Sequence, residues 1–317
     1  MTAFAPKSDS ARKDVANQMT SWAAATSLAA YLCWLRASAS ASTRLRDWGP
    51  RWLARLLAAP LPAIARQLGI DHSVRLDGVT AEELEALAPC VVTISPHGTG
   101  IGHTLLTGPA LVTEPLGVLE PMGMAASVTF RIPLLREVLL LMGWREASEG
   151  MFSRMLRSGR SVVVLPGGIP EMVEMDHKRE ALLCPPELGF VRLAMQHGVP
   201  IQPIYCFGET QLYRQVGWAK PLQRVLAERA RVFLPLLTGR FGLPLPLPAQ
   251  YCIVVGQPVQ TGTATPNPTA EQVRAVFAQW SQEIRRLFAR HAADFLPPEV
   301  VARGLDIQIR QRMRSKL

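Results

Sequence analysis

The chain has 317 residues, a net charge of +9 and an apolar content of 48%. That apolar content is enough for one large or two small folded domains and excludes a mainly disordered chain. The positive charge indicates a polyanionic partner, such as anionic lipid headgroups or a CoA thioester. Nucleic acid is the weaker alternative, because only 7% of the residues are aromatic and the lysines and arginines form no dense block.

The cysteines stand alone and never form a Cys-x-x-Cys pair; they are Cys33, Cys90, Cys184, Cys206 and Cys252. We therefore expect free thiols in a reducing compartment, with neither a zinc site nor a disulfide framework. The beginning of the chain is polar and contains no apolar run. We expect no secretory signal there and assign residues 1–20 to a polar tail.

An apolar and basic helical region is expected over residues 21–70. Its most apolar part, residues 22–35, is shorter than the ~18–20 residues that a membrane span needs. Two structures fit this length: an interfacial or re-entrant helix, and an ordinary core helix. Further on, arginines accompany Trp48 and Trp52, which favours a helix at a membrane interface over a surface helix docked on the core. Pro50, between the tryptophans, offers an alternative helix start.

After residue 70, short β-branched runs alternate with helical stretches. This alternation predicts an α/β domain over residues 71–317, with a mostly parallel sheet and helices on both faces. The predicted strands are residues 90–94, 161–165, 200–207 and 251–255, and the predicted helices are residues 149–157, 187–197 and 269–291. Residues 239–248 alternate proline with apolar residues, which excludes a helix or a central strand. This loop could line an acyl-chain groove; we favour the interpretation that it wraps around the core.

His97 lies in a Pro-His-Gly turn directly after the strand predicted at residues 90–94. The carboxyl ends of strands in an α/β sheet carry binding sites, and imidazole is suited to removing a proton from a hydroxyl. Gly98 and Gly100 would let backbone N–H groups approach a substrate and stabilise an oxyanion. These residues alone leave two interpretations open: a general base, or a histidine that only hydrogen-bonds its own turn.

Metal and serine-hydrolase chemistry are less well supported. His97, His103 and His177 do not have the spacing of a metal site, so we expect no metal and no cofactor. Ser95 is not part of a Gly-x-Ser-x-Gly motif, which argues against a serine hydrolase.

Pro166, Gly167 and Gly168 end the strand predicted at residues 161–165, and Glu171 comes shortly after them. Two glycines at a strand end expose the backbone to an anion or to a closely approaching substrate. Glu171 could orient His97 or position an acceptor hydroxyl; the alternative is a tight turn with a solvated glutamate.

Arg192 and Glu209 are charged residues within apolar sequence. A buried charge needs a partner, so these two residues either contact a substrate or form a structural ion pair.

Taken together and in this order, the motifs resemble the diacylglycerol acyltransferase type 2 family. That family also contains monoacylglycerol and wax-alcohol acyltransferases, and it belongs to the wider glycerolipid acyltransferase group. The resemblance runs from about Pro89 to about Gln308. The matching blocks are Ser-Pro-His-Gly at residues 95–98, Pro-Gly-Gly-x-x-Glu at 166–171, the segment from Gly-Phe-Val-Arg-Leu-Ala to Phe-Gly-Glu at 189–209, Arg-Phe-Gly-x-Pro-x-Pro at 240–246, Val-Val-Gly-x-Pro at 254–258, and Leu-Phe-x-x-His at 287–291.

The resemblance implies that His97 is the catalytic base, with Glu171 as its candidate partner. It implies acyl transfer from acyl-CoA to the hydroxyl of an acylglycerol, as in the conversion of diacylglycerol to triacylglycerol, or of a long-chain alcohol. The substrate-binding residues expected on this basis are Gly98, Gly100, Pro166, Gly167, Gly168, Arg192 and Glu209. The resemblance implies a location at the cytosolic face of a membrane or at a lipid-droplet surface. In a eukaryote this membrane would be that of the endoplasmic reticulum. A homo-oligomer is a further expectation.

The sequence departs from the family pattern at several positions. Ser95 replaces the first histidine of the His-Pro-His-Gly block, and Gly102 stands where the wider group often has an aspartate. Leu188 replaces a basic residue, and the hydrophobic hairpin typical of the family is shortened to residues 22–35. Ser95 therefore keeps a non-catalytic lipid-binding protein of the same fold as an alternative. A hydrolase or thioesterase that passes the acyl group to water is a further alternative, because pocket shape and water exclusion decide the acceptor.

Overall fold

The computed structural model of the chain describes residues 48–113 and 115–310, together with residues 22, 26–27, 29–31, 33–35 and 37–45. The chain divides into two compact units, one ending at Arg44 and the other beginning at Leu45. In the first unit the described residues between Trp22 and Leu35 are helical, and a short helix, η1 (Ala39–Thr43), comes next. The polar tail predicted for residues 1–20 lies outside the described residues.

Within the described ranges, no helix is both long enough and apolar enough to cross a membrane. That the N-terminal helices associate with a membrane stays a prediction.

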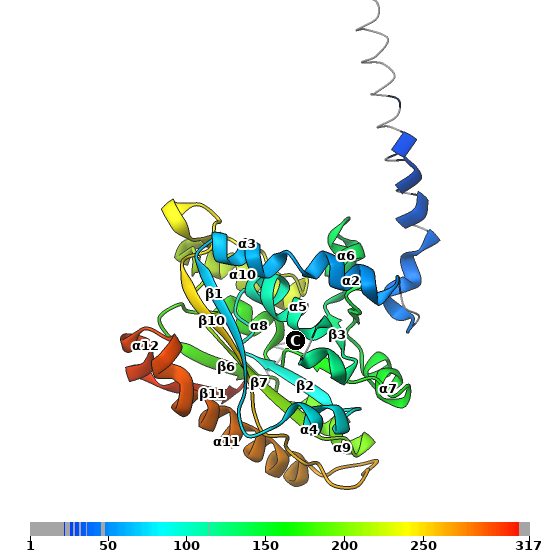
Figure 1. Ribbon diagram of the computed structural model, residues 1–317, viewed down its shortest axis with the longest axis vertical. Helices are drawn as coiled ribbons and strands as arrows, with labels where there is room; N and C mark the ends of the chain where they lie inside the picture. Colours follow the sequence, from blue (N-terminus) through cyan, green and yellow to red (C-terminus); the bar gives the residue numbers. More distant parts are fainter. Residues whose placement is uncertain are drawn as a thin grey trace, which may run out of the picture. The chain divides into compact units, whose positions relative to one another are not determined.

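The second unit is built on a seven-stranded sheet with the order β1-β10-β7-β2-β5-β3-β4 (Figure 1). Neighbouring strands are parallel throughout, except for the antiparallel pair of β10 and β7. The mostly parallel sheet predicted from the sequence is therefore confirmed, although the pattern did not reveal β1, β3 or β4. The strands are β1 (Ile70–Leu76), β2 (Val91–Ser95), β3 (Met122–Ala125), β4 (Arg145–Glu146), β5 (Val162–Val164), β7 (Ile201–Phe207) and β10 (Ala249–Val255).

β2 occupies the middle of the sheet, with β5 on one side and β7 on the other. All five of its residues are buried, which is expected for a β-branched strand covered on both faces. Ser95, its last residue, pairs with Tyr205 of β7. The Pro96-His97 turn therefore leaves the sheet at the carboxyl end of its most protected strand.

Helices cover both faces of the sheet, as the alternation of strands and helices predicted. On one face, α7 (Glu149–Arg157), α9 (Gly189–His197) and α11 (Ala270–Phe295) bury their apolar sides in a common core. On the other face, α3 (Leu61–Gln67), α4 (Ala81–Ala86) and α5 (Gly108–Val112) contribute to a second core. The helices predicted at residues 149–157, 187–197 and 269–291 correspond to α7, α9 and α11.

Smaller elements complete the unit. β6 (Glu180–Cys184) pairs in parallel with β11 (Leu305–Ile309), and β8 (Arg214–Gln215) pairs in antiparallel with β9 (Leu237–Thr238). The other helices are α2 (Arg51–Ala58), α6 (Leu135–Leu141), α8 (Gly168–Glu174), α10 (Lys220–Arg229) and α12 (Pro298–Arg303), and the short or irregular turns are η2 (His103–Thr107), η3 (Leu116–Leu119), η4 (Ser127–Arg131), η5 (Gly217–Ala219) and η6 (Arg240–Gly242).

Two local expectations are decided by the structure. α2 begins at Arg51 with Pro50 as its N-cap, so Pro50 marks a helix start and does not interrupt a longer helix. The proline-rich loop over residues 239–248 does not wrap around the core, because Phe241, Leu243 and Leu245 are exposed. A run of alternating prolines keeps the chain extended, but it does not decide which way the intervening side chains point.

A buried hydrogen bond fastens α11 to the centre of the sheet. The indole Nε1–H of Trp280 donates to Thr93 Oγ1 over 2.8 Å, and both side chains are fully buried. We expect Thr93→Val to lower the free energy of unfolding by about 1–3 kcal/mol, because the indole N–H would lose its acceptor in the core. In a Trp280→Phe background, which has no such N–H, the same substitution should cost much less. Urea denaturation of the four proteins measures this difference, and equal costs in both backgrounds would contradict the account.

Candidate active site

His97 and Glu171 come together at the carboxyl end of β2. The backbone N–H of His97 donates to Glu171 Oε1 over 2.5 Å, and Glu171 Oε2 accepts the N–H of Leu183 over 2.9 Å. Glu171 therefore joins the His97 turn to β6. The sequence predicted that these two residues are partners, but the carboxylate holds the main chain of His97 and not its imidazole.

The imidazole of His97 is half-buried, and its Nδ1 is shielded from solvent with no hydrogen-bond partner in the part of the chain that the structure describes. Loss of solvation, together with a smaller effect of the nearby ring of His103, lowers the pKa of His97 to about 3. The ring centroids of the two histidines are 6.5 Å apart. The ring is therefore neutral at physiological pH, which is the form that can accept a proton.

Glu209 fills the space beneath the glycine-rich turn. Its side chain is fully buried, and its Oε1 accepts the N–H of Gly100 over 3.1 Å. A β-carbon on Gly98 or on Gly102 would collide with this carboxylate group or its side chain. Gly98 also has a φ of +52°. The glycines therefore leave room for a buried carboxylate, and the Gly100 N–H points at Glu209.

A polar network extends from Glu209 to His103. Tyr251 donates its hydroxyl to Glu209 Oε2 over 3.2 Å and lies 3.1 Å from His103 Nδ1. His103 Nε2 is 2.8 Å from the carbonyl oxygen of Pro96, which can only accept, so Nε2 carries the hydrogen. Burial lowers the pKa of His103 to about 4, so the ring is neutral. This network braces the turn from Pro96 to Gly102.

The three buried carboxyl groups of Glu171, Glu180 and Glu209 all have raised pKa values. Loss of solvation raises the pKa of Glu209 to about 8. Loss of solvation, with a smaller contribution from the charge of Glu180, raises the pKa of Glu171 to about 7. Glu180 is itself buried and accepts the hydroxyl of Tyr205 over 2.6 Å.

The Pro166-Gly167-Gly168 turn connects β5 to α8. A β-carbon on Gly167 would collide with the carboxylate of Glu171, and Gly168 has a φ of +55°. In this structure the glycines let Glu171 fold back toward the His97 turn. That they also bind a substrate stays a prediction.

Arg192 and Glu209 are not partners. Arg192, on α9, forms an ion pair with Glu149 at the start of α7, whereas Glu209 bonds the His97 turn. The structure therefore excludes an ion pair between them. Glu209 is fully buried, so its contacts are with the turn and not with an open surface.

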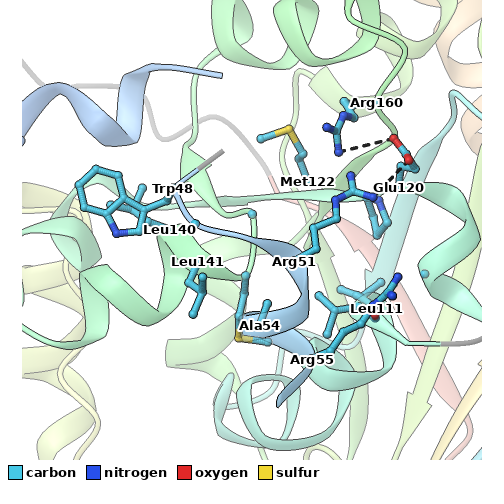
Figure 2. A pocket seen from close by; sticks show the side chains of 16 residues that line it. Trp48, Arg51, Ala54, Arg55, Leu111, Glu120, Met122, Leu140, Leu141 and Arg160 are labelled. Atoms are coloured by element: carbon cyan, nitrogen blue, oxygen red, sulfur yellow. Dashed lines mark hydrogen bonds and ion pairs between the residues drawn. The ribbon is translucent and has the colours of Figure 1, made fainter. Parts of the chain in front are cut away.

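A cavity of about 50 Å³ lies away from these residues, between α2, α5, η3 and α6. Figure 2 shows Arg51 and Arg160 pointing at Glu120, with N–O distances of 3.2 and 3.5 Å. Arg55 donates to the carbonyl oxygen of Val112 over 3.1 Å. The charged groups that line this cavity thus pair with protein atoms, and His97 is not part of its wall.

Sequence reasoning missed His103, Tyr251 and Glu180 as parts of the site. His103 was considered only as a metal ligand, whereas the structure makes it a hydrogen-bonding support of the turn. Tyr251 and Glu180 lie in strands, and no motif marks them. Tyr251 is a polar side chain at the start of an apolar run, which predicts a buried partner without naming it, whereas Glu180 directly follows a polar run and carries no such signal.

The comparisons with known proteins agree with the motifs. The family model described as diacylglycerol acyltransferase matches residues 71–302, and the chain belongs to this family. The resemblance inferred from the motifs is thereby confirmed. The match begins at β1, well before the first motif that carried the inference.

Individual relatives match slightly more than half of the chain. 2-Acylglycerol O-acyltransferase 1 of Mus musculus is 30% identical over 188 residues, which are 55% of this chain and 56% of the relative. Diacylglycerol O-acyltransferase 2 of Homo sapiens is 28% identical over 185 residues, which are 54% of this chain and 47% of the relative. The chain thus spans about half the length of the curated relatives it matches.

Among solved structures, the crystal structure of the 1-acyl-sn-glycerophosphate (LPA) acyltransferase PlsC from Thermotoga maritima is similar with a TM-score of 0.45. It is 16% identical in sequence, and the match covers 78% of this chain and 87% of that chain.

The close approach of Glu209 to Gly102 gives a test of packing. Gly102 has helical φ and ψ, so alanine there meets no backbone strain but collides with Glu209, Leu212 and Tyr251. We expect Gly102→Ala to lower the free energy of unfolding by about 1–3 kcal/mol through overpacking. Gly150→Ala is the matched control, because Gly150 in α7 has open space around its β-carbon position. Equal unfolding free energies for both variants would contradict this packing.

The raised pKa of Glu209 predicts a pH dependence of stability. An unfolded glutamate has a pKa of about 4.3, so between that pH and about 8 the folded protein binds more protons than the unfolded chain. Stability should therefore fall as pH rises through this window. Glu209→Gln removes one titrating group and should reduce the slope by up to about 1.4 kcal/mol per pH unit. Urea denaturation at several pH values tests this, with Glu271→Gln, at an exposed position of α11, as the control whose slope stays unchanged.

Proposed function

We propose that this protein is an O-acyltransferase that moves a fatty acyl group from acyl-CoA to the hydroxyl of an acylglycerol. Diacylglycerol, which would yield triacylglycerol, and long-chain alcohols are the acceptors of this class. The observation that carries the proposal is a neutral His97, held on a braced turn at the end of β2, in a chain that belongs to the diacylglycerol acyltransferase family. The names of the relatives, which are acylglycerol acyltransferases, support it.

In the proposed mechanism, His97 acts as the general base. Because Nδ1 is buried, we assign the proton transfer to Nε2. Nε2 accepts the proton of the acceptor hydroxyl while the oxygen attacks the thioester carbonyl. The tetrahedral intermediate then collapses, the bond between the carbonyl carbon and sulfur breaks, and the CoA sulfur receives the proton from the imidazolium. The ester, free CoA and neutral His97 result, and no cofactor is required.

Glu171 and Glu209 have a positioning role in this proposal. Glu171 holds the His97 backbone N–H and Glu209 holds that of Gly100, so the turn has little freedom to move. A general base contributes most when its nitrogen stays within hydrogen-bonding distance of the acceptor. The pKa of His97 lies far below neutral pH, so its own titration should not limit the reaction between pH 6 and 8.

The proposal includes association with a membrane or lipid-droplet surface. Both the acyl acceptor and the product are lipids, and an enzyme on the cytosolic face of a membrane would meet soluble acyl-CoA and embedded acceptor together. The exposed tryptophan and arginines of α2 support this location.

An assay with purified protein and labelled acyl-CoA tests the function. The reaction is run with and without diacylglycerol, monoacylglycerol and a long-chain alcohol. We expect formation of an acylglycerol or wax ester that depends on the acceptor, and a loss of roughly 10²–10⁴-fold in His97→Ala. His177→Ala is the control and should keep its activity, because His177 lies beside Asp176 between α8 and β6.

Two outcomes would overturn the proposal. Release of free fatty acid alone, whatever the acceptor, would indicate a hydrolase or thioesterase. No turnover in a folded wild-type protein that still binds lipid would indicate a non-catalytic member of the fold.

A further inference from the structure

Exposed large apolar side chains are unevenly distributed over the second unit. The most exposed are Trp52, Leu56, Leu134, Trp218 and Phe241, at 61% to 87%. They belong to α2, to the start of α6, to η5 and to the η6 loop. The less exposed ones cluster in the same way. Among the described residues from Leu45 onward, every exposed large apolar residue except Leu76 and Ile309 lies in one of four places: α2, α3, the segment from η4 to the end of α6, or residues 218–245. Such segregation marks an interaction surface, whereas singly scattered apolar residues do not.

These elements lie at one end of the second unit. In Figure 1, α2, α3, α6 and α10 all lie at the upper end, whereas α4, α9 and α11 lie at the lower end. α2 packs against both α3 and α6. Arg240 of η6 donates to the carbonyl oxygen of Leu68 over 2.8 Å, which fastens the η6 loop to the end of α3. η5, which carries Trp218, leads directly into α10 and packs against it. We call the surface formed by α2, α3, α6, η5, α10 and the η6 loop the apolar end.

The charges of the apolar end are mostly positive. From Trp48 to Gly69 the chain has three arginines and no acidic residue. From Arg214 to Pro248, Glu228 is the only acidic residue among six basic ones. Exposed tryptophan beside arginine and lysine is typical of a surface that lies in the headgroup layer of an anionic membrane. At the opposite end, α4 carries Glu82, Glu83 and Glu85.

The apolar end covers the elements that hold the candidate site. α3 packs against η2, which begins six residues after His97. α10 packs against α8, which carries Glu171, and Gln215 donates to the carbonyl oxygen of Met172. The surface and the site therefore share their supporting helices.

We propose that the apolar end docks the catalytic unit onto the surface of an anionic phospholipid leaflet, with Trp218 and Phe241 inserted below the headgroups. This contact is formed by the catalytic unit itself, largely from segments that come after His97 in the chain, and it does not depend on the unit that ends at Arg44. The inference deepens the proposed function, on which its biological meaning rests. It places the helices around His97 against the lipid phase that would supply the acyl acceptor.

An environment-sensitive fluorophore can report this contact in the full-length chain. Cys33→Ser removes the one exposed cysteine among the described residues, and the other four are buried. The fluorophore NBD is then attached to Trp218→Cys, Phe241→Cys or, as a control, Ile309→Cys on β11. With vesicles of equal parts phosphatidylcholine and phosphatidylglycerol, we expect a blue shift and a several-fold intensity gain at positions 218 and 241, and no change at 309. Lipids with a spin label in the upper acyl chain should quench the first two.

Partitioning of variants provides the second readout. Trp218→Ser combined with Phe241→Ser should weaken vesicle binding by tenfold or more, since two large apolar side chains no longer leave water. Ile309→Ser should bind as the wild type does. Vesicles of phosphatidylcholine alone should bind less protein than the anionic ones, because a leaflet without net charge does not attract the excess of basic residues in these segments.

Three results would overturn the inference. The first is vesicle binding without any change in the fluorescence of the labels at positions 218 and 241, which would mean that other segments contact the lipid. The second is a lipid-free dimer, seen by analytical ultracentrifugation, that the double substitution dissociates, which would make the partner a second copy of the chain. The third is unchanged vesicle binding by the double variant. Acyl transfer is also measured with substrates in detergent micelles, where the enzyme does not need to dock on a leaflet. Activity in micelles would therefore support the proposed function even if the docking inference failed.

Discussion

Two buried glutamate carboxyl groups hold the turn that carries His97, and the arrangement of the site depends on them. Glu171 accepts the N–H of His97, and Glu209 accepts the N–H of Gly100. A turn outside the sheet has backbone donors that no strand can satisfy, and a buried carboxyl group needs hydrogen-bond partners in place of water. Each group thus satisfies the other. The need for glycine at positions 98 and 102 results from this pairing, because a side chain there would occupy the space of Glu209.

The sheet order explains how the two carboxylates reach the same turn. β2 lies between β5 and β7, and all three run parallel. Glu171 comes after β5 through the Pro166-Gly167-Gly168 turn, and Glu209 comes two residues after β7. The loops at the carboxyl ends of parallel strands lie at one edge of the sheet, so residues far apart in the sequence meet around His97. Gly102, where the wider acyltransferase group often has an aspartate, is the position against which the Glu209 carboxylate packs.

Burial sets the ionisation of the site more than any single ion pair does. The same loss of solvation that keeps His97 and His103 neutral raises the pKa values of Glu171 and Glu209. The apolar end adds a second level of organisation, because α3 and α10 pack against η2 and α8 beside the site and belong to the surface that exposes apolar side chains and basic charge. Shielding of the site from water would suit the proposed reaction between a thioester and a lipid hydroxyl.

The sequence by itself determined the family, the α/β class, most central strands and the prediction that His97 and Glu171 meet, because these depend on local patterns of apolar residues, turns and motifs. It also determined that Glu209 and Arg192 need partners, since charges within apolar sequence are costly to bury alone. Only the tertiary structure decided which partners they have: the His97 turn for Glu209 and Glu149 for Arg192. It likewise decided the roles of His103 and Tyr251, and that the proline-rich loop exposes Phe241 and does not cover the core. Contacts between distant segments depend on strand order and helix packing, which no local pattern specifies.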